Sequence, residues 1–245
     1  MNSSLEMRLN AGFCAFECDF DLLVEQFVSW QRQVLRSCGA GADFKRVEGR
    51  IGKLIERLDP PVRPVPTKNL FLKSSSEWVI GLDNGYRGTD GGMAPVMSGM
   101  LACRTVRVVS QPDIRIHGKR VKYGTQILEV YRNGEYERTL YCANDGGRWT
   151  FDQSGSPYPF EDVSRYGVRR IADRFRREDL LQCLEHLSLR PFDSKWFELA
   201  NASCFGAIVV RTGSYPRNYT EMSENTGESS LFGRLKAVCD WFGRH

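Results

Sequence analysis

The chain has 245 residues, of which 41% are hydrophobic and 26% charged, and its formal net charge is +4. These proportions are typical of globular proteins and exclude a chain that is disordered over most of its length. The charge is too small for a dedicated DNA-binding domain, and no stretch approaches the roughly 18 apolar residues that a membrane-spanning helix needs.

Two amphipathic helices are predicted at the N-terminus. Apolar side chains recur at helical spacing over residues 19–36, and Asp19 suits the start of that helix. A glycine-containing break follows, after which Asp43 can cap a second helix over residues 43–58. Residues 1–59 are therefore predicted to form a helical hairpin.

A proline-rich segment comes next. Its four prolines lie within seven residues, at Pro60, Pro61, Pro64 and Pro66. Because proline interrupts both helices and sheet interiors, residues 60–68 are predicted to form an extended connector. This connector would separate the hairpin from an α+β domain that spans residues 69–245.

The sequence pattern then changes to β-strands. Strands are predicted over residues 78–82, 105–109 and 148–152, with a short helix over 93–102. The clearest element is a hairpin over residues 125–142, because Asn133-Gly134 readily forms the type I′ turn that right-twisted strands prefer. Together these strands would form an antiparallel meander.

The last third of the chain is predicted to be mainly helical. Apolar spacing predicts helices over residues 160–176, 178–187 and 231–242, with one strand over 206–211 and an exposed loop over 213–230. The complete prediction is an α+β fold in which an antiparallel meander sheet is flanked by helices and preceded by the N-terminal helical hairpin.

Two loop-like segments, residues 82–92 and 144–149, share one composition. Both combine glycine with acidic, amide, arginine and aromatic residues. Glycine permits tight turns, so the side chains between the glycines are displayed. We therefore expect a partner-binding surface made of Asp83, Asn84, Tyr86, Arg87, Asp90, Asp145 and Arg148.

A hydrolase and a nucleic-acid or phage-associated accessory protein are weaker alternatives. The loop carboxylates Asp83, Asp90 and Asp145 could place two acids across a cleft, as a hydrolase requires, but turns favour aspartate in any case. No nucleophilic triad or phosphate-binding loop accompanies them. The six arginines of residues 165–177 could bind nucleic acid from a helix, although intramolecular ion pairs on a solvated helix are the favoured interpretation.

Eight cysteines are scattered along the chain, mostly beside apolar neighbours. There is no Cys-x-x-Cys pair, and the three histidines lack ligand spacing, so neither a metal site nor a cofactor is predicted. The first residues also lack the apolar region of a signal peptide. The sequence thus predicts a soluble, cytoplasmic protein with reduced thiols.

Three short strings carry a resemblance to a known class. WVIGLDNGYRGTD (78–90), ANDGGRWTF (143–151) and PFED (159–162) resemble segments of cytoplasmic immunity proteins of bacterial polymorphic and type VI secreted toxins. The resemblance covers roughly residues 70–195. It implies a protein without catalysis of its own, which binds one cognate toxin domain and blocks its active site. The mildly basic charge speaks against a nuclease as that toxin, because inhibitors of nucleases usually present an acidic surface.

Overall fold

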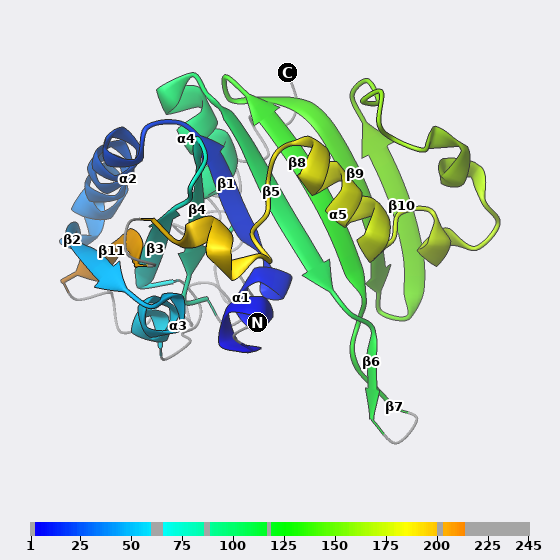
Figure 1. Ribbon diagram of the computed structural model, residues 1–245, viewed down its shortest axis with the longest axis horizontal. Coiled ribbons are helices and arrows are strands. Elements are labelled where there is room, and N and C mark those ends of the chain that lie inside the picture. The colour runs from blue at the N-terminus through cyan, green and yellow to red at the C-terminus, as the bar shows by residue number, and fades with distance from the viewer. Residues whose placement is uncertain (1–2, 60–65, 86–88, 117–118, 200–202, 214–245) are drawn as a thin grey trace.

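A nine-stranded antiparallel sheet runs through the structure and carries helices on both faces (Figure 1). The computed structural model describes residues 3–59, 66–85, 89–116, 119–199 and 203–213. The strands of the sheet follow the order β10-β9-β8-β5-β1-β4-β3-β11-β2, and a separate two-stranded ribbon joins β6 to β7. The fold class is therefore α+β, as the sequence predicts.

The described elements are the following. The strands are β1 (Phe13–Glu17), β2 (Gly41–Gly49), β3 (Lys68–Lys73), β4 (Trp78–Asp83), β5 (Arg104–Gln111), β6 (Ile114–Ile116), β7 (Lys119–Lys122), β8 (Thr125–Arg132), β9 (Glu135–Asp145), β10 (Arg148–Ser154) and β11 (Cys204–Thr212). The α-helices are α1 (Ser3–Ala11), α2 (Phe20–Leu35), α3 (Ile51–Ile55), α4 (Met93–Leu101) and α5 (Arg177–His186). Short 3-10 turns are η1 (Arg36–Cys38), η2 (Glu56–Leu58), η3 (Val163–Gly167), η4 (Ile171–Asp173) and η5 (Ser194–Phe197).

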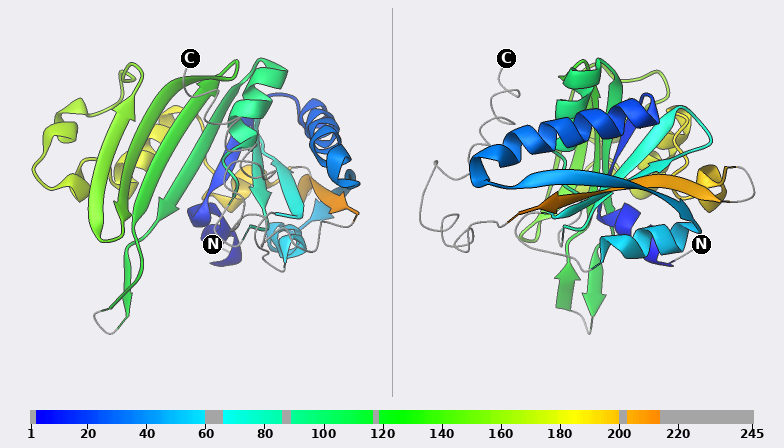
Figure 2. Two further views of the ribbon diagram at one scale, coloured as in Figure 1. Left: turned by 180° about the vertical axis from the view of Figure 1, so that it is seen from behind. Right: turned by 90° about the vertical axis from the view of Figure 1, so that its left-hand side faces the viewer.

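The helices form a hydrophobic layer on each face of the sheet. On one face α1, α3 and α5 pack against the strands, and Leu9 and Leu184 belong to this cluster. On the other face α2 and α4 cover the sheet, with Met97 in a second cluster (Figure 2). The central strand β1 serves both clusters because successive side chains, such as Ala15 and Phe16, point to opposite faces.

Most of the predicted elements with a strong local signal are confirmed. The first predicted helix is α2, and the side chain of Asp19 caps it by accepting a hydrogen bond from the Leu22 amide at 2.9 Å. The hairpin is β8–β9, and its turn residues Asn133 and Gly134 have φ values of 54° and 86°, as a type I′ turn requires. The predicted strands near residues 78, 105, 148 and 206 and the helices α4 and α5 are also present.

The second helix of the predicted N-terminal hairpin is wrong. Gly41–Gly49 is an edge strand, β2, which pairs along its whole length with β11, and only the short α3 follows it. Phe44 and Val47 stand at helical spacing in the sequence. In the strand, however, Val47 is buried while Phe44 remains 41% exposed at the edge of the sheet. Since β1 and β2 both belong to the main sheet, the segment before the prolines is not a separate hairpin. Residues 60–65 of the predicted connector lie outside the described residues.

The predicted helix over residues 160–176 is also wrong, because this segment forms two 3-10 turns. Arginine side chains bind backbone carbonyls across it: Arg165 Nη2 donates to the Asp173 oxygen at 3.1 Å, and Arg174 Nε donates to the Val168 oxygen at 3.0 Å. These tertiary contacts replace helical hydrogen bonds. The predicted helix over 231–242, and the predicted loop beyond Gly213, lie outside the described residues.

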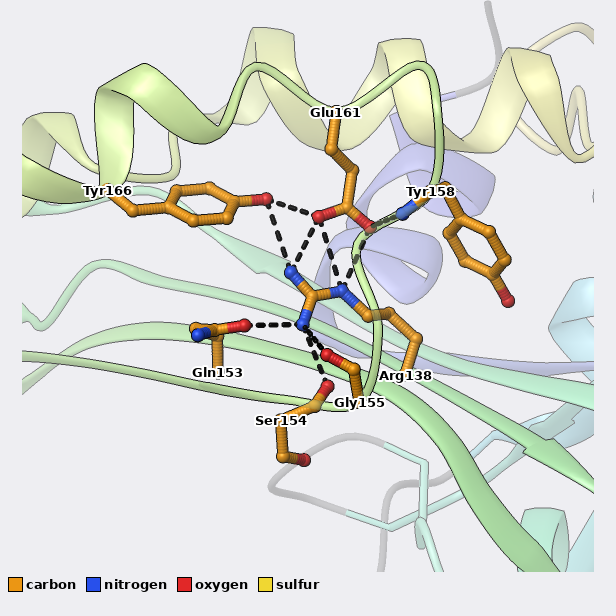
Figure 3. Close-up of polar contacts among 7 residues, drawn as sticks. All are labelled: Arg138, Gln153, Ser154, Gly155, Tyr158, Glu161 and Tyr166. Carbon is orange, nitrogen blue, oxygen red and sulfur yellow. Dashed lines mark hydrogen bonds and ion pairs between the residues drawn. The ribbon is translucent and has the colours of Figure 1, made fainter.

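A fully buried ion pair fastens the segment after β10 to the sheet (Figure 3). The side chains of Arg138 and Glu161 are 0% and 1% exposed, and Nη2 lies 2.6 Å from Oε2. Arg138 Nε donates to both carboxylate oxygens, at 2.9 and 3.2 Å. Nη1 donates to the side chain of Gln153 and to the carbonyls of Ser154 and Gly155 at 2.5, 2.8 and 2.9 Å.

Glu161 receives further hydrogen bonds from its own segment. The Tyr166 hydroxyl donates to it at 2.5 Å, and the Tyr158 amide donates at 2.9 Å. Burial alone would raise the pKa of Glu161, but the bonds from Arg138, Tyr166 and the Tyr158 amide outweigh burial and hold that pKa below its ordinary value. The carboxyl group is therefore ionised at neutral pH, and the pair is a complete, satisfied network.

Replacing Glu161 with glutamine tests this network. The Glu161→Gln variant leaves the Arg138 guanidinium buried without a counter-charge, so the free energy of unfolding should fall by about 3–5 kcal/mol at pH 7. Because the folded pKa of Glu161 is depressed, the advantage of the wild type should shrink as the pH falls below the ordinary carboxyl pKa of 4.5. Urea denaturation at several pH values measures both effects.

Two further variants provide the control for this experiment. Glu185→Gln changes an exposed carboxylate of α5 and should alter stability by less than about 0.5 kcal/mol. The double variant R138M/E161L removes both charges and should be more stable than Glu161→Gln. Equal stability of the double and single variants would show that an uncompensated buried charge is not the cause of the loss.

Candidate functional site: a pocket beside helix α4

An open pocket of about 470 Å³ lies between α4 and the strands β5 and β8. The loop at residues 90–92 and the β8–β9 turn at residues 133–136 complete its walls. Seen from behind the sheet, α4 lies over this part of the strands (Figure 2). The volume falls within the range of roughly 300–1,000 Å³ that is usual for ligand pockets.

The inner surface of the pocket carries an ion pair. Arg107 of β5 and Glu129 of β8 are opposite each other in register, and Nη1 lies 2.9 Å from Oε2. The hydroxyl of Tyr131 donates to the same Oε2 at 3.0 Å. Burial alone would lower the pKa of Arg107, but Glu129 raises it, while burial and Glu129 together raise the pKa of Tyr131. The guanidinium is therefore charged and the tyrosine protonated at neutral pH.

Glycines bring the pocket walls close together. A Cβ atom at Gly91 would lie 2.1 Å from Arg107 Nε, so only glycine allows the loop to cover the guanidinium in this way. On the opposite wall, a Cβ atom at Gly134 would lie 3.2 Å from the Cα of Gly99, and the Gly134 amide donates to Ser98 Oγ at 3.1 Å. The β8–β9 turn is thus attached directly to α4.

The rim combines exposed apolar, aromatic and acidic side chains. Met100 is 44% exposed and Tyr136 is 50% exposed. The exposed ring of Tyr136 packs against the buried ring of Tyr131, with the two centroids 4.6 Å apart. Asp90 and Glu135 are exposed at the rim as well. A partner would therefore meet apolar area and carboxylates together.

Among the predicted binding residues, Asp83 and Asn84 are wrong as surface contacts, since they are only 2% and 0% exposed. Asp83 accepts hydrogen bonds from the amides of Gly85 and Asp90, both at 2.7 Å. Asn84 Oδ1 accepts from the amides of residues 67 and 68 at 2.9 and 3.0 Å. Both side chains hold the loop in place, and neither presents a polar group to a partner.

The remaining predicted residues have different outcomes. Asp90 lines the pocket, whereas Tyr86, Arg87 and the side chain of Asp145 lie outside the described part of the chain. Arg148 is exposed on β10, far from the pocket.

The sheet register shows how far Arg148 lies from the pocket. Glu129 pairs with Thr139, which pairs with Ser154, and Arg148 lies six residues further along β10, or about 20 Å at the rise of a strand. The two predicted loops therefore do not share one pocket.

Several pocket residues were not predicted from the sequence, above all Arg107, Glu129 and the tyrosines. One signal was available: each charged residue stands between apolar neighbours inside a predicted strand, as in Val106-Arg107-Val108 and Leu128-Glu129-Val130. A charge at such a position on a half-buried strand calls for a partner of opposite sign.

The described residues give no support to a metal centre or to an arginine helix. No group of three or more histidine, cysteine, aspartate or glutamate side chains within them is placed to hold a metal ion. Arg165, Arg170 and Arg176 all lie within ion-pair distance of nearby carboxylates, as expected of intramolecular pairs. No helix in the described ranges is long and apolar enough to cross a bilayer.

Comparisons with protein-family models, curated proteins and solved structures found no match to this chain. The chemistry of the pocket is therefore inferred from its own side chains.

The pH dependence of stability tests the buried role of Asp83. Burial raises the pKa of its carboxyl group from 3.8 to about 7, despite the hydrogen bonds from the amides of Asp90 and Gly85. Between these pH values the folded state binds the extra proton, so this group makes wild-type stability fall as the pH rises from about 4 to about 7, by a few kcal/mol at most. Above that window the contribution of Asp83 should be constant.

The Asp83→Asn variant cannot titrate at this position. The free energy of unfolding of the variant relative to the wild type should therefore increase across the same window, as measured by urea denaturation at several pH values. Glu25→Gln, an exposed change on α2, should show no such trend. A relative stability of Asp83→Asn that does not change with pH would contradict the buried, protonated carboxyl.

Proposed function

We propose that this chain is a cytoplasmic immunity protein that binds a cognate secreted bacterial toxin domain and blocks its active site without catalysis of its own. The observation that carries the proposal is the open pocket beside α4, which adjoins the loop that holds Asp90. The resemblance of residues 78–90 and 143–151 to immunity proteins of secreted toxins supports the same function.

The composition of the pocket suits a protein partner. Interface hot spots are rich in tyrosine, and methionine is enriched in interface cores. Here the exposed Tyr136 of β9 lines the pocket together with Met100, Pro95 and Val96 of α4. A projecting side chain of a partner can therefore bury apolar area in the pocket while its backbone contacts the polar rim.

The carboxylates of Glu129 in the pocket and of Asp83 beneath its loop are better placed for binding than for hydrolysis. Glu129 is occupied by Arg107 and Tyr131, and Asp83 is turned toward backbone amides under the loop. A general base must reach the proton that it removes, directly or through one water. Carboxylates that are already paired or buried are better suited to hold the shape of a binding surface.

Capture of the partner tests the function. We expect the tagged chain, purified gently from its native cell, to retain a stoichiometric protein that mass spectrometry identifies as a secreted toxin domain. The Met100→Lys variant places a bulky charge at the pocket rim and should weaken this complex by about tenfold or more. Binding to the purified partner, measured by calorimetry, gives the ratio.

The chain offers a matched control. Met7 of α1 is 65% exposed on the other face of the sheet, so Met7→Lys should leave the affinity unchanged. Co-expression of the wild-type chain should also relieve the toxicity of the captured domain, and Met100→Lys should relieve it less. Equal affinities of the two lysine variants, or a partner that is not toxic, would refute the proposal.

A further inference from the structure

The described lining of the pocket carries more negative than positive charge. Three carboxylates, Asp90, Glu129 and Glu135, face one guanidinium, Arg107, which leaves a formal charge of −2. Arg107 and Glu129 neutralise each other through their ion pair. Neither Asp90 nor Glu135 forms an ion pair with any residue in the described ranges. Within the part of the chain that the structure describes, Asp90 and Glu135 are therefore two pocket carboxylates without a paired cation.

We infer that this pocket receives a cationic side chain of the partner protein, a guanidinium or ammonium group on an aliphatic stem. This inference rests on the proposed function for the identity of the partner, and on the pocket alone for the chemistry of the group that enters. Asp90 and Glu135 are the groups that select the charge.

The walls of the pocket match the two parts of such a side chain. Pro95, Val96 and Met100 provide apolar area against which the stem of an arginine or lysine can lie. The half-exposed ring of Tyr136, which packs against the buried ring of Tyr131, provides an aromatic surface for the cation, and such contacts contribute about 0.5–1 kcal/mol at exposed sites. Apolar stem and charged head are thus both accommodated.

An anionic group is disfavoured in the same place. Arg107 Nη1 already donates to Glu129, and Nε is buried without a hydrogen-bond partner in the described structure, next to Gly91. A carboxylate or phosphate that entered the pocket would have to compete with Glu129 for Arg107 and would face Asp90 and Glu135 as well. The single arginine therefore does not make the pocket an anion site.

A peptide titration tests the inference without the natural partner. The full chain, labelled with ¹⁵N, is titrated with the acetylated tripeptide amide Gly-Arg-Gly and, separately, with the uncharged isostere Gly-citrulline-Gly. We expect millimolar binding of the arginine peptide with shifts at the amides of Gly91, Gly99 and Gly134, and citrulline binding weaker by about fivefold.

Charge removal at the rim provides the second measurement. Asp90 Oδ1 accepts a hydrogen bond from the Gly92 amide at 2.9 Å. The double variant D90N/E135Q keeps a side-chain oxygen at position 90 for this bond, so the loop should remain folded. Its affinity for the arginine peptide should fall by about threefold to tenfold. Glu185→Gln removes an exposed carboxylate on the other face and should have no effect. Thermal unfolding of each variant confirms that the fold is retained.

The possible results separate the inference from the proposed function. Equal binding of the two peptides, tighter binding of a Gly-Glu-Gly peptide, shifts outside the pocket, or an unchanged affinity of D90N/E135Q would each overturn the cationic occupant. A toxin complex that Met100→Lys disrupts would still support the function in those cases. Conversely, selective arginine binding together with no captured toxin would support the pocket chemistry and reject the function.

Discussion

The ion pair between Arg138 and Glu161 is the interaction on which one half of the structure depends. A guanidinium with no exposed area can be tolerated only if its N–H groups find acceptors, and the segment after β10 supplies them. The carboxylate of Glu161 and the carbonyl of Gly155 come from that segment, and the carbonyl of Ser154 comes from the last residue of β10. The segment between β10 and α5 is therefore held against β9 and β10. Phe175 and the apolar side chains of α5 complete the hydrophobic layer on that face.

The same strands build the pocket on the opposite face. Side chains alternate along β8, so Leu128 and Val130 enter the layer beneath α5, while Glu129 and Tyr131 face α4. Strand β9, which carries Arg138, pairs with β8 along its length, and the β8–β9 turn contacts α4 through Gly134 and Ser98.

The sequence was sufficient where structure is set by neighbours in the chain. The Asp19 cap and the Asn133-Gly134 turn each act over a few residues, and the elements that they predict are present. It was insufficient where a distant partner decides: β2 is a strand because β11, near the other end of the described chain, pairs with it. Residues 160–176 are not helical partly for the same reason, since Glu161 pairs with Arg138 of β9 and the Ile171 carbonyl accepts a hydrogen bond from Cys142 Sγ of β9.

The site follows the same division. Asp90 was predicted because its loop composition is visible locally, and Asp83 was misplaced because a turn aspartate looks alike whether it faces solvent or backbone amides. The pair of Arg107 and Glu129 becomes meaningful only when β5 and β8 are placed side by side in register. Composition can find a displayed loop, but it cannot find a pocket that three separate segments enclose.

The charge of the whole chain is a poor guide to the partner of this pocket. The net charge of +4 suggests a partner with an acidic surface, whereas the described pocket lining carries −2. Electrostatic interactions between exposed charges are screened over about 8–10 Å at physiological ionic strength.

The basic run at residues 165–177 belongs to the face of α5, where Arg165, Arg176 and Arg177 approach Asp179 and Glu6 within ion-pair distance. A partner that approaches from the side of α4 would therefore interact mainly with Asp90 and Glu135 and little with those arginines, so the toxin proposed as the partner can have a basic surface although this chain has a net positive charge.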